Sequence, residues 1–344
     1  MIGLINGKFT DSAGEITSSP ATIIQPGTDL IASIVEDTPG VYYLASGTHV
    51  TGTALDFTKL SGVHIIGLPG AVLQQSGANA IIEGTAPSNT QYGINAITSG
   101  DRAITTDTAG DAGNFSAGDM IKVTDGTDQM VNEVVAVDGG TGVIDTLYPW
   151  GSAFGAGATV ELISSTPTEN FILENVEIDS NGQAFEGLKN QSGAKNCQVR
   201  NIIFSGGETT GNTKIEDVHN MKCFYENITN TKTADHSGAC FKINLCTDCK
   251  VQVRAIGSYS AGTQAGVSMS NSWYCKGDLG AIACQNGVYI HRGGGGPYNI
   301  IAYENVANGV VGSNVEYTTF TGVSRNNGTN SAMSGTTNTV SLRT

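Results

Sequence analysis

The sequence has few of the features that mark most other protein classes. Charged residues make up 14% of the chain, prolines number 8, and no stretch carries the apolar spacing of a long amphipathic helix. No run of about 18 apolar residues occurs, so no membrane-spanning helix is expected. The first residues, "MIGLINGKFTDSAGE", lack the basic and apolar segments of a secretion signal. We therefore expect synthesis in the cytosol and no membrane insertion.

Basic residues are scarce as well. The chain has 17 Lys and Arg against 31 Asp and Glu, a net charge of −14. Nucleic acid phosphates and anionic membranes would repel such a chain, so we expect no nucleic acid partner. An acidic polysaccharide stays open as a ligand, because a local basic patch can bind it.

The seven cysteines fit neither a disulfide framework nor a metal site. Their number is odd, and Cys246 and Cys249 form the single pair at C-x2-C spacing. We expect buried thiols, no metal and no cofactor, because free cysteine packs as a small hydrophobe. Buried free thiols also suit a protein made in a reducing compartment.

Glycine is abundant, with 46 residues, and four cysteines recur at a fixed step of 26. A fixed step of this size predicts a solenoid in which each turn covers the next and like residues stack. Four positions further on, asparagines recur, and we expect them to adopt left-handed backbone and bond from turn to turn. The first column is Phe171, Cys197, Cys223, Cys249, Cys275 and Ile301, and the second is Asn175, Asn201, Asn227, Val253, Leu279 and Asn305.

The chain is therefore predicted to be all-β, a single-stranded right-handed parallel β-helix. A second strand per turn is expected at 238–244, 265–271, 286–292 and 308–314. A short helix over 28–37, with Thr28 as N-cap and Leu30, Ile31, Ile34 and Val35 on one face, would cap the solenoid. We expect an N-terminal cap with first turns (1–88), an inserted β subdomain of three or four strands (89–166), the main turns (167–325) and a polar C-terminal tail out of register (326–344).

Several segments resemble the pectate-lyase-like family of right-handed parallel β-helices. They are "PGVYYLASGTHV", "LSGVHIIGLPGAVL" and the later repeats that end in asparagine, within residues 28–84 and 167–325. The family includes secreted pectate lyases, polysaccharide epimerases and bacteriophage tailspikes. The resemblance implies a virion surface protein of tailspike type that binds and depolymerises host surface polysaccharide, as a homotrimer attached to other virion proteins. The alternatives are an extracellular enzyme, or a noncatalytic virion protein that uses the solenoid as a rigid scaffold.

One outward face of the second strand collects residues suited to chemistry on a glycan. Arg292 or Lys242 would neutralise a uronate carboxylate while His291 or Tyr289 moved the adjacent proton, which is lyase or epimerase chemistry. The alternative is an ordinary solvent-facing sheet. The candidate catalytic residues are Asp235, His236, Tyr289 and His291, and the candidate substrate-binding residues are Lys242, Arg292, Asn244 and Ser270.

A glycosidase would instead need two carboxylates flanking the bond. Glu208, Glu216, Asp217 and Asp235 are the candidates for that pair. A further polar column is interpreted as an exposed ladder of mixed charge rather than a site. Its members are Glu174, Arg200, Glu226, Gln252, Asp278 and Glu304.

Overall fold

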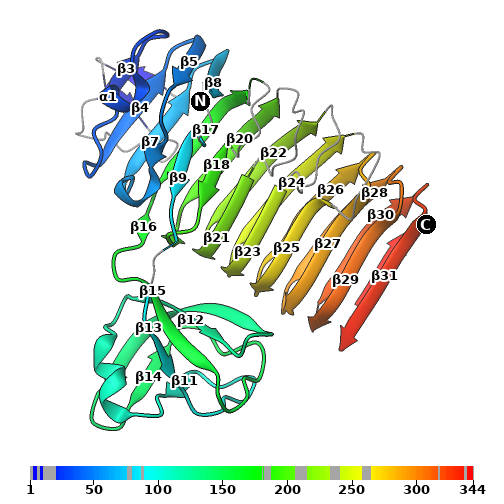
Figure 1. The fold of residues 1–344 in the computed structure, drawn as a ribbon. Helices are drawn as coiled ribbons and strands as arrows, with labels where there is room; N and C mark the ends of the chain where they lie inside the picture. The colour runs from blue at the N-terminus through cyan, green and yellow to red at the C-terminus, as the bar shows by residue number, and fades with distance from the viewer. Residues whose placement is uncertain are drawn as a thin grey trace.

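The computed structural model shows a parallel β-solenoid of about ten turns with a separate β subdomain beside it (Figure 1). It describes residues 3–5, 8–10, 21–75, 80–86, 89–179, 181, 187–205, 215–232, 241–257, 265–316, 318–336 and 339–343. The predicted fold class is confirmed. No helix in these ranges is long and apolar enough to cross a bilayer.

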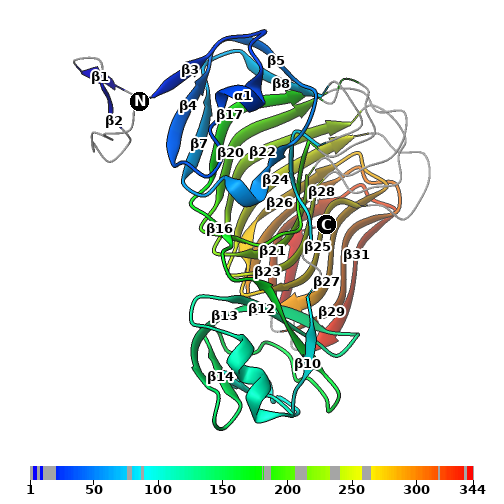
Figure 2. The ribbon, with the colours of Figure 1, turned by 60° about the vertical axis from the view of Figure 1, so that its left-hand side comes forward.

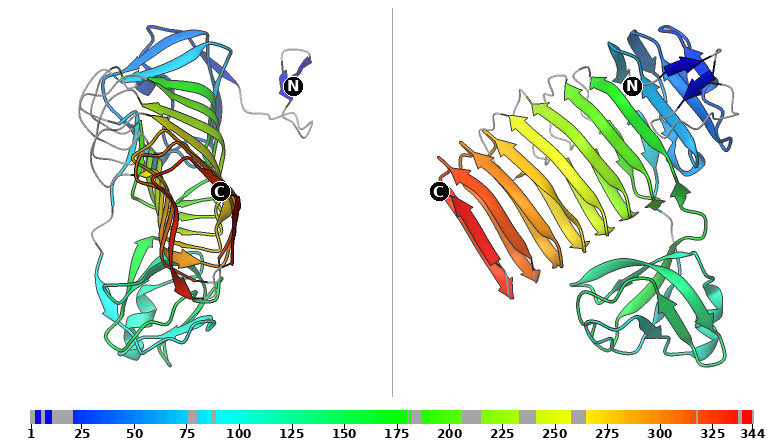
Figure 3. Two further views of the ribbon diagram at one scale, coloured as in Figure 1. Left: turned by 90° about the vertical axis from the view of Figure 1, so that its right-hand side faces the viewer. Right: turned by 180° about the vertical axis from the view of Figure 1, so that it is seen from behind.

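Two parallel sheets form the walls of the solenoid (Figure 3). They enclose one apolar core. The 13-stranded sheet contains β3 (Thr22–Ile24), β4 (Gly40–Leu44), β5 (Gly47–Thr51), β7 (Val63–Gly67), β8 (Ala71–Gln75), β17 (Ile172–Asp179), β20 (Gln198–Ser205), β22 (Phe224–Lys232), β24 (Lys250–Gly257), β26 (Lys276–Ile282), β28 (Pro297–Tyr303), β30 (Thr319–Arg325) and β32 (Thr339–Arg343). The 11-stranded sheet contains β6 (Leu55–Asp56), β9 (Ile82–Gly84), β16 (Thr168–Glu169), β18 (Leu188–Asn190), β19 (Ala194–Lys195), β21 (Ile215–Met221), β23 (Phe241–Thr247), β25 (Ala265–Trp273), β27 (Asn286–Gly294), β29 (Asn308–Glu316) and β31 (Thr329–Thr336).

The subdomain is an antiparallel sheet inserted between β9 and β16 (Figure 2). It has six strands, where the sequence indicated three or four. These are β10 (Gln91–Gly93), β11 (Ala103–Thr105), β12 (Met120–Thr124), β13 (Gln129–Asp138), β14 (Val143–Thr146) and β15 (Thr159–Ser164), with the 3-10 helix η2 (Ala109–Asn114). The pair β1 (Gly3–Ile5) and β2 (Lys8–Thr10) and the 3-10 helix η1 (Phe57–Lys59) complete the elements.

The thiol column is confirmed through four turns. Strands β17, β20, β22, β24 and β26 begin in register at steps of 26, and Cys197, Cys223, Cys249 and Cys275 are all buried in the core. The prediction for Ile301 is wrong. The next turn is shorter by five residues, so Ile301 pairs with Gly280 and its side chain is exposed.

The asparagine column is confirmed in its first three members. Asn175, Asn201 and Asn227 all have left-handed backbone, with φ of 60°, 53° and 51°. The Asn201 amide donates to Asn175 Oδ1, and the Asn227 amide donates to Asn201 Oδ1, each at 2.9 Å. The column stops there because a register shift between Tyr225 and Ile228 removes one residue from the next turn. Val253, Leu279 and Asn305 are consequently buried and do not continue the ladder.

The N-terminal helix is shorter than predicted. Helix α1 covers Leu30–Ser33, and its N-cap is Asp29, not Thr28, because the Asp29 carboxylate accepts from Ile31 N at 3.0 Å. Leu30 and Ile34 are buried as expected, whereas Val35 is exposed since the helix ends before it.

The solenoid register continues beyond the predicted end of the repeat. Strand β31 pairs in parallel with β29, and β32 pairs in parallel with β30. The prediction that the tail 326–344 lies out of register is therefore wrong for strands β31 and β32. Short turns of 21 or 22 residues hid the repeat from a search at a step of 26.

Candidate functional site

The inserted subdomain docks on the 11-stranded sheet where its strands end. The outward column Lys195, Met221, Thr247 and Trp273 is buried there. The Trp273 indole donates to Gln129 O at 3.1 Å, and the Thr247 hydroxyl donates to Val131 O at 2.6 Å. Buried aromatic and backbone contacts of this kind hold the subdomain against the solenoid.

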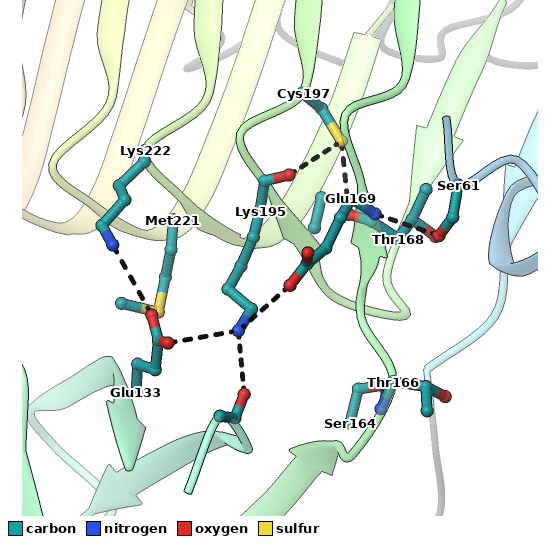
Figure 4. A network of polar contacts seen from close by, with 12 residues as sticks. Ser61, Glu133, Ser164, Thr166, Thr168, Glu169, Lys195, Cys197, Met221 and Lys222 are labelled. Atoms are coloured by element: carbon teal, nitrogen blue, oxygen red, sulfur yellow. Dashed lines mark hydrogen bonds and ion pairs between the residues drawn. The ribbon is translucent and has the colours of Figure 1, made fainter. Parts of the chain in front are cut away.

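A polar network lies along the same junction (Figure 4). The Lys195 ammonium donates to Gly118 O at 2.8 Å and lies 3.4 Å from a Glu133 oxygen and 3.3 Å from a Glu169 oxygen. Lys222 lies 3.6 Å from the other Glu133 oxygen. Because the Lys195 side chain is only 7% exposed, its charge is compensated by these carboxylates rather than by water.

Beyond the docked subdomain, the outer face of the 11-stranded sheet carries the predicted rungs. Strand pairing aligns Lys242, Ser268 and Tyr289 in one rung. The neighbouring rung aligns Asn244, Ser270 and His291. Successive members are one strand spacing apart, about 4.8 Å.

Tyr289 and His291 form the aromatic part of this face. Their rings are stacked, with centroids 5.9 Å apart and planes at 9°, and the Tyr289 hydroxyl lies 3.5 Å from His291 Nδ1. Burial, followed by the Arg292 guanidinium, lowers the pKa of His291, and Asp128 opposes this shift. A neutral imidazole beside a tyrosine can hydrogen-bond to a sugar and stack against it.

Arg292 connects the outer face to the subdomain. Its backbone is left-handed, with φ of 51°, and forms a bend in the strand. Asn271 and Asn314 occupy the same position in the neighbouring turns. The guanidinium donates from Nη1 to Thr127 O, and Nε lies 4.0 Å from Asp128 Oδ1. The predicted substrate-binding cation is therefore engaged by the subdomain.

Asp128 is held in place by the turn between β12 and β13. The Asp125 carboxylate accepts from the backbone N–H of Thr127 and of Asp128, each at 2.8 Å, which is an Asx-type turn. Asp128 Oδ2 in turn accepts from the Ser152 hydroxyl at 3.1 Å. The turn thus presents a fixed carboxylate to the solenoid.

Glu316 supplies a second carboxylate. It pairs with Gly294 at the end of β29, in the same column as Trp273. Burial raises the pKa of Glu316, and the nearby charge of Asp128 raises it further. We name Asp128, His291, Arg292 and Glu316 the charge cluster.

The remaining predicted residues are placed as follows. Asn244 Oδ1 accepts from the side-chain amide of Asn271 at 3.4 Å, and Lys242 and Ser270 are half-buried on the outer face. Glu216 and Asp217 lie in β21, at the register positions of Lys242 and Ile243. Asp235, His236 and Glu208 lie outside the described residues.

Sequence reasoning missed Asp128 and Glu316. The Asp-Gly turn in "VTDGTDQMV" was visible, but its docking on the solenoid was not. Glu316 could have been found by continuing the column of Trp273 through the two short turns. Across the described ranges, no group of three or more His, Cys, Asp or Glu side chains could hold a metal ion.

Comparison with known proteins finds that this chain is similar to several solved structures. No protein-family model matches the chain, and no curated protein matches it. The tailspike protein gp49 of Pseudomonas phage LKA1 is 10% identical, with a TM-score of 0.47, over 89% of this chain and 69% of that one. The tailspike Gp54 of Acinetobacter baumannii bacteriophage AP22, solved in complex with A. baumannii capsular saccharide, is 10% identical, with a TM-score of 0.43, over 88% of this chain.

A third similar structure is the tailspike gp61 of Pseudomonas phage phi297. It is 11% identical, with a TM-score of 0.44, over 82% of this chain. The chain spans 60% of the length of the AP22 protein and 52% of the length of the phi297 protein. The function below is argued from the residues of this chain.

Proposed function

We propose that the chain is a virion surface protein of tailspike type that binds a host surface polysaccharide on the outer face of the 11-stranded sheet and cleaves it. The observation that carries this proposal is the charge cluster beside the stacked Tyr289 and His291 rings. It combines an aromatic surface with two carboxylates in different surroundings. Pairs of titratable groups with different environments are typical of acid–base sites.

The geometry favours glycosidic hydrolysis over uronate lyase chemistry. Lyase chemistry would require Arg292 or Lys242 to neutralise the substrate carboxylate, and of these two cations Arg292 already donates to Thr127 O and lies beside Asp128. Glu316, whose raised pKa favours the protonated form, is instead suited to protonate the leaving oxygen. Asp128 would take the proton of the water that adds to the anomeric carbon as the glycosidic bond breaks.

The other predicted residues keep supporting roles in this proposal. Tyr289 and His291 would contact the sugar rings, and Lys242, Asn244 and Ser270 would bind hydroxyl groups along the same face. As the resemblance implies, we also propose a homotrimer that attaches to other virion proteins.

The test is the rate at which purified protein releases reducing ends from bacterial capsular and O-antigen polysaccharides. Glu316→Gln should lower this rate by about 100-fold or more while leaving polysaccharide binding intact, because only the proton is lost. Glu304→Gln is the matched control. Glu304 is exposed and directly follows β28 of the 13-stranded sheet, away from the charge cluster. Its rate should equal that of the wild type.

Three outcomes would overturn the proposal or part of it. Binding without cleavage by the wild type would leave a noncatalytic adhesin. Neither binding nor cleavage would favour a rigid virion scaffold. Equal rates for Glu316→Gln and the wild type would remove Glu316 from the reaction.

A further inference from the structure

A groove of about 500 Å³ lies on the outside of the 13-stranded sheet, away from the charge cluster. It follows the bend made by the left-handed asparagines and crosses strands β20, β22, β24 and β26. We name it the axial groove, because it runs from turn to turn along the solenoid. Its lining residues are Asn201, Glu226, Asn227, Ile228, Thr229, Gln252, Val253, Arg254 and Asp278.

The asparagine ladder ends inside the axial groove. Each amide donates to the preceding asparagine, so the carbonyl oxygen of the last member has no successor to bond to. That member is Asn227, because the register shift after Tyr225 puts no asparagine in the next turn. Asn227 lines the groove, and its Oδ1 is thus an acceptor with no hydrogen bond to another described residue.

Two charged side chains in the groove are likewise unengaged. Among the residues the structure describes, neither Glu226 nor Arg254 makes a side-chain hydrogen bond or ion pair. The opposite wall is ordered instead, since Asp278 accepts from Gln252 at 3.0 Å and from Asn299 at 3.2 Å. The groove therefore offers donors and acceptors together, on a rigid support.

An aromatic ring flanks these polar groups. Phe224 lies two residues before Glu226 on the same face of β22 and is only half-buried. The Lys250 ammonium lies 4.6 Å from the centroid of its ring. A half-buried aromatic ring next to mixed donors and acceptors suits the apolar faces and hydroxyl groups of a sugar.

We propose that the axial groove is a second polysaccharide-binding site, which holds an uncharged stretch of the polymer without cleaving it. Glu226 and Asp278 against Arg254 give the described lining a net negative charge, which disfavours uronates and phosphates. Hydroxyl groups donate and accept, so they can satisfy Arg254, Glu226 and Asn227 alike. The choice of polysaccharide as ligand rests on the proposed function, whereas the location of the groove does not.

The test measures binding to an array of bacterial capsular and O-antigen oligosaccharides, both neutral and uronate-bearing. All variants carry Glu316→Gln so that no ligand is cleaved. Arg254→Ala and Asn227→Gly, which keeps the left-handed bend, should each weaken binding of a neutral oligosaccharide about tenfold. Asn175→Gly is the matched control, since Asn175 shares the ladder and the φ but does not line the groove.

The outcomes separate this inference from the proposed function. If the groove variants bind like their parent while Glu316→Gln abolishes cleavage, the groove inference fails and the proposed function stands. If the groove variants lose binding but the wild type cleaves nothing, the groove stands and the catalytic proposal fails. Preference for uronate-bearing oligosaccharides would overturn the assigned ligand class.

Discussion

Residues in the left-handed conformation build the bends of this solenoid. Asparagines occupy one bend, which their tolerance of this conformation predicts. A bend in the 11-stranded sheet instead uses His219, Leu245, Asn271 and Arg292, with φ between 47° and 63°. For residues other than Gly, Asn and Asp this conformation costs about 1–2 kcal/mol each, so packing between turns must impose it. Local sequence preference therefore identifies the first bend but not the second.

His219 gives this second bend a pH dependence. Burial lowers the pKa of His219 to about 4, although its bond to Gln191 O and the charge of Glu161 oppose the shift, and Lys122 adds to it. In the unfolded chain the pKa of a histidine is about 6.5. Neutral His219 therefore leaves the free energy of unfolding undiminished above pH 6.5. As the pH falls from 6.5 toward 4, protonation of the unfolded chain lowers that free energy by about 3 kcal/mol.

We therefore expect His219→Asn, which suits the left-handed backbone, to reduce the loss of stability between pH 7 and pH 4.5. The measurement is the midpoint of urea unfolding at each pH for both proteins. Carboxylates elsewhere titrate alike in both proteins. The difference between the two plots of urea midpoint against pH therefore reports on His219 alone. Parallel slopes would contradict the assigned burial of a neutral imidazole.

At the scale of elements, sequence periodicity predicted the strands wherever the step stayed constant. The columns through Phe171 and Cys275 were right because each turn there repeats after 26 residues. Ile301 was misplaced because the next turn is five residues shorter and nothing in the sequence marks the deletion. The rungs containing Tyr289 and His291 were found because strand alternation does not depend on loop length.

The docking of the subdomain on the solenoid could not be predicted from the sequence. Contacts between Arg292 and Asp128 join residues more than 160 positions apart on two different sheets. No column or periodic pattern relates them, since the subdomain does not share the solenoid repeat. Asp128 therefore became visible as a member of the charge cluster only when the subdomain was seen on the 11-stranded sheet.

The docking contact yields a test of its own. A Cβ added to Gly151 would lie 2.0 Å from the Trp273 ring, so Gly151→Ala must push the subdomain away from the solenoid. We expect faster proteolysis between the two units and a lower rate of polysaccharide cleavage, because Asp128 moves away from Glu316. Gly155→Ala is the control, since no heavy atom lies within 4 Å of a Cβ added there. Equal protease resistance of both variants would contradict the docked arrangement.

The molecule as a whole is quasi-one-dimensional. Each turn contacts its neighbours in the two sheets (Figure 3). The core is a continuous stack of side chains from β3 to β32. In such a stack, stability is a sum of terms for single turns and for adjacent pairs. Damage to one turn should therefore spread to its neighbours and decline with distance along the axis.

Phe320 allows this locality to be measured. It is fully buried in β30 and stacks on Tyr298 of the preceding turn, with centroids 6.0 Å apart. Phe320→Ala should cost about 3–5 kcal/mol locally. Amide hydrogen exchange should then accelerate in β28, β30 and β32 and remain unchanged in β17 and β20, several turns away. Phe204→Ala in β20 is the reciprocal control and should accelerate exchange around β17–β22 instead. If either substitution accelerated exchange equally along the whole solenoid, the turns would be folding as one cooperative unit rather than as coupled neighbours.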